Sequence, residues 1–256
     1  MSVTAPFDSA ATNYDSDFTQ TPLARALRAI VWKRLDSLFP PGARVLELAC
    51  GTGEDARHLA ERGVHVLATD QSEKMLEVAK SKCAGLPVEF ARLDMSNWEL
   101  VNSNLSRFDG AFSNFGGLNS ITNYQLLSSN LQSLIRPGGK LLFVIMGRHC
   151  AWEILWHLLH GDTATAFRRW RHGGALARVG EATMTVHYPS TTELRRAFAP
   201  HFRLVRVLPL GNFLPPSYLE PLTRRRWFPF QVFTRLDRQL PWPLWADHTI
   251  YEFVRE

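Results

Sequence analysis

The chain has 256 residues, 45% of them hydrophobic, which is enough for a substantial core in one α/β domain with insertions. Its 29 basic and 24 acidic side chains give a net charge of +5, far from the clustered charge of a dedicated nucleic-acid-binding protein. The three cysteines, at positions 50, 83 and 150, have no paired spacing, so the sequence predicts neither a disulfide framework nor a zinc site.

The amino-terminal segment lacks the pattern of a secretion signal, which is a basic stretch followed by an apolar one. No uncharged apolar run approaches the ~18 residues of a membrane span. We therefore expect a soluble, cytoplasmic protein.

The first predicted helix begins at Pro22, is capped by Thr21 and ends before the turn at 40–42. Apolar side chains recur along it with a period of 3.6 residues. They are Leu23, Leu27, Ile30, Val31, Leu35 and Leu38. Residues 1–40 are thus expected to form an N-terminal cap segment and a helix.

An apolar run at 45–50 leads into Gly51-Thr52-Gly53 and then into a predicted helix over 54–62. Such a run suits a strand that is covered on both faces. The two glycines let the backbone turn tightly and approach a ligand, and the helix presents unpaired N–H groups there. This strand–turn–helix unit predicts a site for a nucleotide-type cofactor.

Strand and helix patterns continue to alternate as far as residue 148, which favours a parallel sheet with right-handed crossovers. They comprise a strand at 65–70, helices at 73–82 and 124–135, and a strand at 141–146. The pattern then loosens. It predicts a helical segment at 149–176, a short strand at 184–188, a helix after the capping box at Ser190, and strands at 202–208 and 249–254.

The ordered motifs of residues 10–148 resemble the class I S-adenosylmethionine-dependent methyltransferases. The first motif of that family, an acid followed by Gly-x-Gly, stands here as Glu47, Gly51 and Gly53. A strand that ends in Asp70 follows about 20 residues later, and an acid there can accept both ribose hydroxyls of an adenosine. Later segments match the ends of the family's third and fourth strands and the turn before its fifth. They lie at 91–95, 108–115 and 134–140.

The resemblance implies one α/β domain over residues 1–256, with a doubly wound, seven-stranded and mostly parallel sheet. Helices would cover both faces, and the last strand would be antiparallel. Residues 41–148 would form the cofactor-binding half and residues 149–256 the substrate-side half. The latter would carry helical or aromatic insertions at about 149–180 and 211–247.

The resemblance also implies the cofactor S-adenosyl-L-methionine, with S-adenosyl-L-homocysteine as product. The family's cofactor-contacting positions correspond here to Tyr14, Glu47, Ala49, Cys50, Gly51, Gly53, Asp70, Gln71, Met75, Asp94, Met95, Asn114 and Phe115. The glycine turn would cradle the methionine end, and Glu47 would organise that turn or receive the ammonium through water. Asp70 would bind the ribose.

Other roles implied by the resemblance concern the adenine and the methyl group. Gln71, Met75 and Met95 would lie near the adenine, and Asp94 would accept its amino group. Asn114 and Phe115 would line the methyl-transfer site, and Tyr14 would fold over the cofactor. Purely structural explanations of these residues stay open. Asp94 could cap a loop, the two methionines could be core residues, Asn114 could be a turn residue, and Tyr14 could lie in a disordered tail.

Methyl transfer from a sulfonium is an in-line displacement that depends on alignment and exclusion of water, so no universal catalytic residue is expected. His149 and Glu153 follow the fifth strand and are candidate proton acceptors for a phenol, acid or amine. Glu153, His157 and His160 share a helix face, but no fourth ligand is evident, so no metal site is predicted.

Two rival classes share parts of this pattern. The glycine loop also fits the Gly-x-Gly-x-x-Ala of dinucleotide oxidoreductases. A short-chain dehydrogenase would carry a Tyr-x-x-x-Lys pair, but no tyrosine in this chain is followed four residues later by lysine. Methylation of an exocyclic base nitrogen usually needs Asn/Asp-Pro-Pro-Tyr/Phe, where this chain has Asn114-Phe115-Gly116-Gly117. We predict a methyltransferase acting on an oxygen or nitrogen of a small, largely apolar molecule. The alternatives are a non-catalytic cofactor-binding protein of this fold and an RNA methyltransferase.

Arginines and aromatic residues are interleaved at 168–171 and 224–228. These runs predict either solvated helix surfaces or an insertion surface for a lipophilic or anionic substrate, with weak contact to a membrane surface. No specific nucleic-acid partner is expected.

Overall fold

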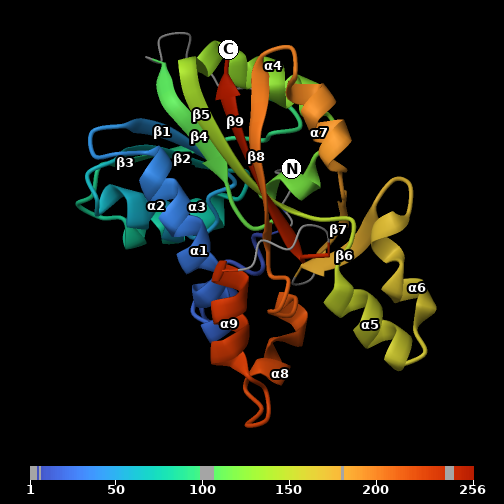
Figure 1. The fold of residues 1–256 in the computed structure, drawn as a ribbon. Coiled ribbons are helices and arrows are strands. Elements are labelled where there is room, and N and C mark those ends of the chain that lie inside the picture. Colours follow the sequence, from blue (N-terminus) through green and yellow to red (C-terminus); the bar gives the residue numbers. More distant parts are fainter. Residues whose placement is uncertain (1–4, 6, 99–106, 180–181, 240–244) are drawn as a thin grey trace.

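The computed structural model describes residues 5, 7–98, 107–179, 182–239 and 245–256, and its centre is a seven-stranded sheet (Figure 1). The strands of this sheet are β1 (Arg44–Leu48), β2 (His65–Asp70), β3 (Val88–Arg92), β4 (Phe108–Ser113), β5 (Ile135–Met146), β8 (Phe202–Leu210) and β9 (His248–Arg255). The longer helices are α1 (Pro22–Leu38), α2 (Glu54–Ala60), α3 (Glu73–Lys82), α4 (Tyr124–Leu134), α5 (Ala151–Leu159), α7 (Thr191–Phe198) and α9 (Phe230–Gln239).

The strand order is β3-β2-β1-β4-β5-β9-β8. β1 to β5 pair in parallel, whereas β9 is antiparallel to both of its neighbours, β5 and β8. The predicted fold class, including the antiparallel last strand, is confirmed. The order reverses between β1 and β4, which is where open α/β sheets bind their ligands.

Two hydrophobic layers cover the two faces of the sheet, because successive strand residues point to opposite sides. On one face, β1 contributes Val45 to a layer closed by α1, α2 and α3. On the other face, Leu46 joins a layer closed by α4 and α7. Figure 1 shows these two helix groups on opposite sides of the sheet. The sheet is therefore rigid on both faces, and its carboxyl ends have a fixed position.

The predicted helix over 149–176 is wrong in its extent. α5 ends at Leu159, because Gly161 (φ +75°) takes a left-handed conformation that stops the helix. The short α6 (Thr163–Ala166) follows, and β6 (Ala175–Val179) then pairs with β7 (Ala182–Val186) in a second, two-stranded sheet. The short strand expected near 184–188 thus pairs with a strand that begins at the end of the segment assigned to a helix, at Ala175.

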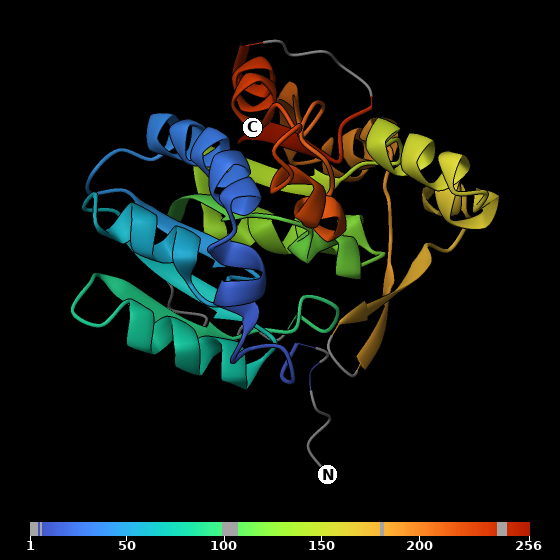
Figure 2. The same cartoon turned by 90° about the horizontal axis from the view of Figure 1, so that it is seen from below.

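The second expected insertion, 211–247, contains the short α8 (Glu220–Thr223) as well as α9, and its residues 240–244 lie outside the described residues. Figure 2 views the molecule from below and shows the N-terminal segment (dark blue) between the cyan cofactor half and the orange-to-red C-terminal elements. In the part of the chain that the structure describes, no helix has the length and apolarity needed to cross a membrane.

The aromatic layer under α7 gives a test of the fold. Phe198 is fully buried, and its ring lies 4.8 Å from that of Phe253 and 5.6 Å from that of Phe143. Phe198→Ala should lower the free energy of unfolding by about 3–5 kcal/mol in urea denaturation, because it leaves a cavity between α7 and the sheet. The control Val205→Ala, at an exposed position of β8, should change it by less than about 0.5 kcal/mol. Equal effects would contradict the packing described here.

Candidate functional site

The carboxyl ends of β1 and β4 carry two residues with unusual backbone conformations. Ala49 (φ +53°) follows β1 and Phe115 (φ +49°) follows β4, and no other non-glycine residue in the described ranges has a positive φ. Left-handed conformations cost free energy for residues with a Cβ and cluster at functional sites. Gly117 lies against this turn, since a Cβ added to it would be 2.6 Å from that of Ala49. The two loops are thus packed against each other at the switch point.

The two glycines of the β1–α2 loop have different roles. Gly53 (φ +75°) faces α3, where an added Cβ would be 2.8 Å from the Cβ of Ala79. Gly51 (φ +54°) faces open space, with no atom within 4 Å of such a Cβ. Gly53 is therefore required by helix packing, whereas Gly51 leaves room for a ligand above the turn.

Asp70, at the end of β2, connects the first two loops of the site. Its Oδ2 accepts a hydrogen bond from the Gly51 backbone N–H (2.8 Å), and its Oδ1 accepts one from the Ser72 N–H (2.9 Å). Burial raises the pKa of Asp70, although these backbone hydrogen bonds oppose the shift. The carboxylate is thus held in one orientation beside the glycine turn.

Glu47 and Asn114 are buried at the same end of the sheet. The Oε2 of Glu47 has no hydrogen-bond partner, whereas the Asn114 side chain lies beside the Asp55 carboxylate. Burial, together with the nearby Asp55 carboxylate, raises the pKa of Glu47 well above its usual range. Unpaired buried polar groups are unfavourable, and a polar ligand at the strand ends would satisfy them.

Asp94 and Gln71 lie together at the ends of β3 and β2. The Gln71 Nε2 donates to the Oδ2 of Asp94 (3.1 Å), and the Ser96 N–H donates to its Oδ1 (2.8 Å). Met95 is half-buried against the α4 side of the core. Met75, on α3, is fully buried, so its position also fits a purely structural role as a core residue.

Cys50 is also buried, and burial raises the pKa of its thiol well above the usual range. A thiol that stays protonated is a poor nucleophile. Its backbone N–H donates to the carbonyl oxygen of Thr69 (2.8 Å), which holds the start of the glycine turn on β2. Cys50 therefore contributes to the site through its backbone.

The N-terminal segment is fixed across the mouth of these loops. The Thr52 Oγ donates to Asp15 (2.6 Å), whose carboxylate also pairs with Lys82 (2.7 Å). Further along, the Ser72 Oγ donates to Asp8 (2.5 Å). Tyr14 is partly buried, and burial together with nearby carboxylates raises its pKa to about 12. The N-terminal segment is thus an ordered cap.

A buried ion pair that the sequence analysis did not identify supports the centre of the site. Arg28 of α1 donates to Asp55 (2.5 Å), which also accepts from the indole N–H of Trp32 (2.6 Å). Burial opposes ionisation of Asp55, but the Arg28 charge holds its pKa below the usual value. The guanidinium also lies 4.8 Å from the ring centre of Phe115. The sequence contains one signal for this ion pair, because Arg28 occupies a core-facing position of an otherwise apolar helix face.

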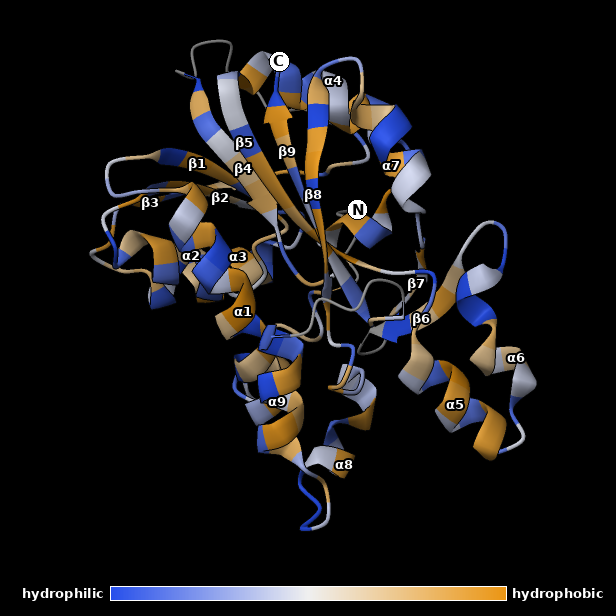
Figure 3. Ribbon diagram, in the orientation of Figure 1, coloured by the Kyte–Doolittle hydropathy of each residue, from blue (hydrophilic) through white to orange (hydrophobic). Residues whose placement is uncertain are grey.

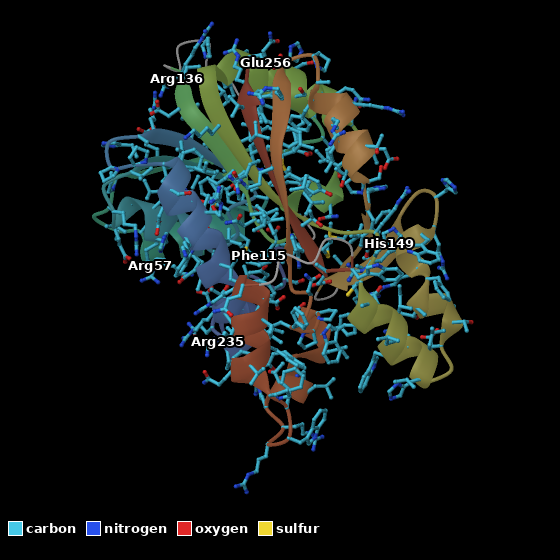
Figure 4. All side chains as sticks on the ribbon, viewed as in Figure 1. Arg57, Phe115, Arg136, His149, Arg235 and Glu256 are labelled. Carbon is cyan, nitrogen blue, oxygen red and sulfur yellow. The ribbon has the colours of Figure 1, made fainter. Side chains whose placement is uncertain are left out.

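The two candidate proton acceptors lie elsewhere. His149 is exposed, and its ring packs near those of Trp170 and Trp245, each 5.6 Å away. Figure 4 shows it well to one side of Phe115. Glu153 is fully buried and accepts two hydrogen bonds each from Arg168 and Arg169, so its pKa is lowered despite burial. These surroundings favour a structural role for Glu153.

His248, which the sequence analysis did not single out, reaches the site instead. It begins β9, is buried, and its ring lies 5.7 Å from that of Phe115. Its Nδ1 is 3.0 Å from Asp247 Oδ2, and Arg169 donates to Asp247 Oδ1 (2.6 Å). No spacing or composition signal precedes β9, so only the fold could identify this histidine.

The residues at the strand ends fit S-adenosylmethionine. The open face of Gly51 provides space, Asp70 provides an acceptor for hydroxyls, and Glu47 provides an unpaired oxygen for an ammonium group. Within the described ranges, no group of three or more histidine, cysteine, aspartate or glutamate side chains could hold a metal ion.

Comparisons with known proteins agree with this geometry. Residues 45–139 match the family model described as "Methyltransferase domain". An uncharacterized methyltransferase of Mycobacterium tuberculosis is 34% identical over 125 residues, 48% of this chain and 61% of the relative. A ubiquinone/menaquinone biosynthesis C-methyltransferase of Bordetella parapertussis is 32% identical over 149 residues, 56% of this chain and 55% of the relative. The chain thus spans little more than half the length of these relatives.

Solved structures share the fold over nearly the whole chain. The CcbJ methyltransferase of Streptomyces caelestis superimposes with a TM-score of 0.61 at 17% identity. The superposition covers 98% of this chain and 97% of the CcbJ chain. DhpI, solved as a complex with S-adenosylmethionine, gives a TM-score of 0.60 at 20% identity and covers 98% and 94%. Residues 45–139 of this chain thus match a methyltransferase domain, and the fold around them is shared with the CcbJ methyltransferase and DhpI.

Proposed function

We propose that this protein is an S-adenosylmethionine-dependent methyltransferase that acts on an oxygen or nitrogen of a small, largely apolar molecule. The observation that carries the proposal is the arrangement at the β1–β4 switch point. There the open Gly51 turn, the fixed Asp70 carboxylate and the unpaired oxygen of Glu47 converge within the matched methyltransferase domain.

The residues proposed to hold the cofactor are distributed along the strand ends. Asp70 would accept hydrogen bonds from the ribose hydroxyls, since each of its oxygens has a second lone pair. The Asp94–Gln71 pair would face the adenine, and Glu47 would receive the ammonium directly or through water. When bound, the cofactor supplies an activated methyl group on a positively charged sulfur.

The chain's own contribution would be alignment and exclusion of water. The tilted rings of the cap residues Tyr14 and Phe18 lie 5.5 Å apart, and the edge of one ring meets the face of the other in the pair Phe18 and Phe115, 6.1 Å apart. Arg28 on one side and His248 on another hold the Phe115 ring in place. This aromatic wall closes the site from the side of the N-terminal cap and suits an apolar acceptor.

The geometry favours His248 over His149 and Glu153 as the acceptor of the substrate's proton. The Asp247 carboxylate lies 3.0 Å from the Nδ1 of His248, so its negative charge would stabilise the protonated ring. Burial opposes ionisation of Asp247, but the charges of His248 and Arg169 hold its pKa far below the usual value. A proton lost by a hydroxyl or amine would pass to the imidazole as the new bond to the methyl carbon forms.

A second candidate is methylation at carbon. It is favoured by the 32% identity to the C-methyltransferase of Bordetella parapertussis over 56% of this chain. The same cofactor site would serve either acceptor. The two can be separated by identifying the methylated atom in the product by mass spectrometry and NMR.

Cofactor binding should depend on the Asp70 carboxylate. Asp70→Asn should weaken binding of S-adenosylhomocysteine roughly 10- to 100-fold in calorimetric titration, because a charged hydrogen-bond acceptor is replaced by a neutral one. Glu89→Gln removes an exposed acid from β3 and serves as the matched control. If the two variants bind equally well, the proposed ribose site is wrong.

Glu47 should favour binding at the expense of stability. Its pKa is raised in the folded protein, so the native state holds a proton that the unfolded chain releases once the pH exceeds the usual glutamate value. The carboxyl group therefore destabilises the fold increasingly as the pH rises from that value through the raised pKa. Glu47→Gln should raise the melting temperature more at neutral than at acidic pH and should weaken cofactor binding. An unchanged melting temperature at both pH values would refute this.

His248 should matter for turnover more than for cofactor binding. His248→Gln should lower kcat about 10²- to 10⁴-fold, while the Kd for S-adenosylhomocysteine changes little. Turnover is measured as S-adenosylhomocysteine formed with a panel of phenols, carboxylic acids and amines. His65→Gln, at the amino end of β2, is the control, and His149→Gln tests the histidine suggested by the sequence. A large loss confined to His149→Gln would move the proton acceptor to His149.

A further inference from the structure

Two segments that project from the carboxyl end of the sheet have exposed apolar side chains. The first is α5, where Leu155, Leu158 and Leu159 occupy positions i, i+3 and i+4 on one helix face. Leu155 is 61% exposed and Leu159 is 82% exposed. A helix packed on a soluble domain normally turns a polar face to water. Figure 3 shows α5 as a largely orange, hydrophobic helix that stands away from the sheet.

The second segment is the loop at 224–229 together with the outer face of α9. Trp227 in this loop is 71% exposed, and Val232 on α9 is also exposed. The inner face of α9 is accounted for by packing, because Phe230 and Phe233 contact the main core. We name α5 and this second segment together the apolar tips. Figure 1 shows both on the same side of the molecule, below the sheet.

Positive charge surrounds the second tip, while its acids point inward. The exposed basic side chains are Arg224, Arg225, Arg226, Arg235 and Arg238. The nearby acids are already engaged. Glu220 of α8 is buried and pairs with Arg224 (2.9 Å), and Asp237 of α9 accepts hydrogen bonds from the backbone N–H groups of residues 212–214. The outward face therefore attracts an anionic partner.

We propose that the apolar tips dock the protein on the surface of an anionic lipid bilayer. The leucines and Trp227 would enter the boundary between headgroups and acyl chains, and the arginines would contact lipid phosphates and carboxylates. A second copy of this chain fits less well, since a symmetric contact would place the Arg224–Arg226 runs against each other. A nucleic acid would leave the exposed leucines of α5 without a partner.

The test uses the full chain and sedimentation with vesicles of phosphatidylcholine, with or without phosphatidylserine. The protein should be retained by the phosphatidylserine vesicles at low salt and released at high salt, because salt screens charges at a surface. Arg225→Glu with Arg226→Glu should lower the partition coefficient by about tenfold or more. Arg195→Glu with Arg196→Glu, an exposed pair on α7, makes the same change in net charge and should have little effect.

The apolar part of the proposal has its own variants. Leu155→Ser with Leu159→Ser, and separately Trp227→Ala, should weaken retention severalfold without changing charge or circular dichroism, because these side chains are exposed. Absence of retention on any vesicle would overturn the proposal. So would equal losses in the two arginine pairs, or retention that is insensitive to both apolar variants. A dimer that dissociates in the leucine variant, without vesicle binding, would assign the surface to a second copy instead.

This surface does not depend on methyl transfer. Calorimetric titration of the same variants with S-adenosylhomocysteine should match the unmodified protein, so the docking surface and the proposed enzyme activity can fail separately.

Discussion

The hydrogen bond between Asp70 and the Gly51 backbone is the interaction on which the site depends. It joins the loops after β1 and β2 at the point where the strand order reverses. The backbone of Gly51 is left-handed (φ +54°), a conformation that glycine adopts without the steric cost of a Cβ. The N-terminal cap then attaches to the same two loops, through Thr52 on one and Ser72 on the other. The cap is therefore positioned by the loops it covers.

The two buried acids near this hydrogen bond, Asp55 and Glu47, differ in how well their burial is compensated. Asp55 is neutralised by Arg28 and the Trp32 indole, so its burial is compensated. Glu47 lies close to Asp55 and Arg28, yet one of its carboxylate oxygens has no hydrogen-bond partner. An uncompensated acid in the core lowers stability, whereas a cationic ligand would offset that cost. The contrast between these two acids separates a structural ion pair from a binding group.

The cofactor half was largely predictable because local signals and topology agree there. The glycines, Asp70 and Asp94 all follow strands whose order the alternating pattern determines. Arg28 was missed, although its place on an apolar helix face was visible in the sequence. The role of Met75 stays a prediction, since an apolar side chain on α3 suits an adenine pocket and a core equally well.

The substrate-side half was less predictable because its key contacts join residues that are distant in sequence. Arg169 donates to Glu153 of α5 and to Asp247 ahead of β9, 78 positions away, and Asp247 in turn lies against His248. No periodicity encodes such a network. With Glu153 fully buried and shared by two arginines, the network fixes α5 on the end of β9. Breaking one partner of a buried pair is strongly unfavourable, so α5 keeps its position while its leucines remain outside. The buried network that orients His248 toward Phe115 is thus the same one that holds an apolar helix out in solvent.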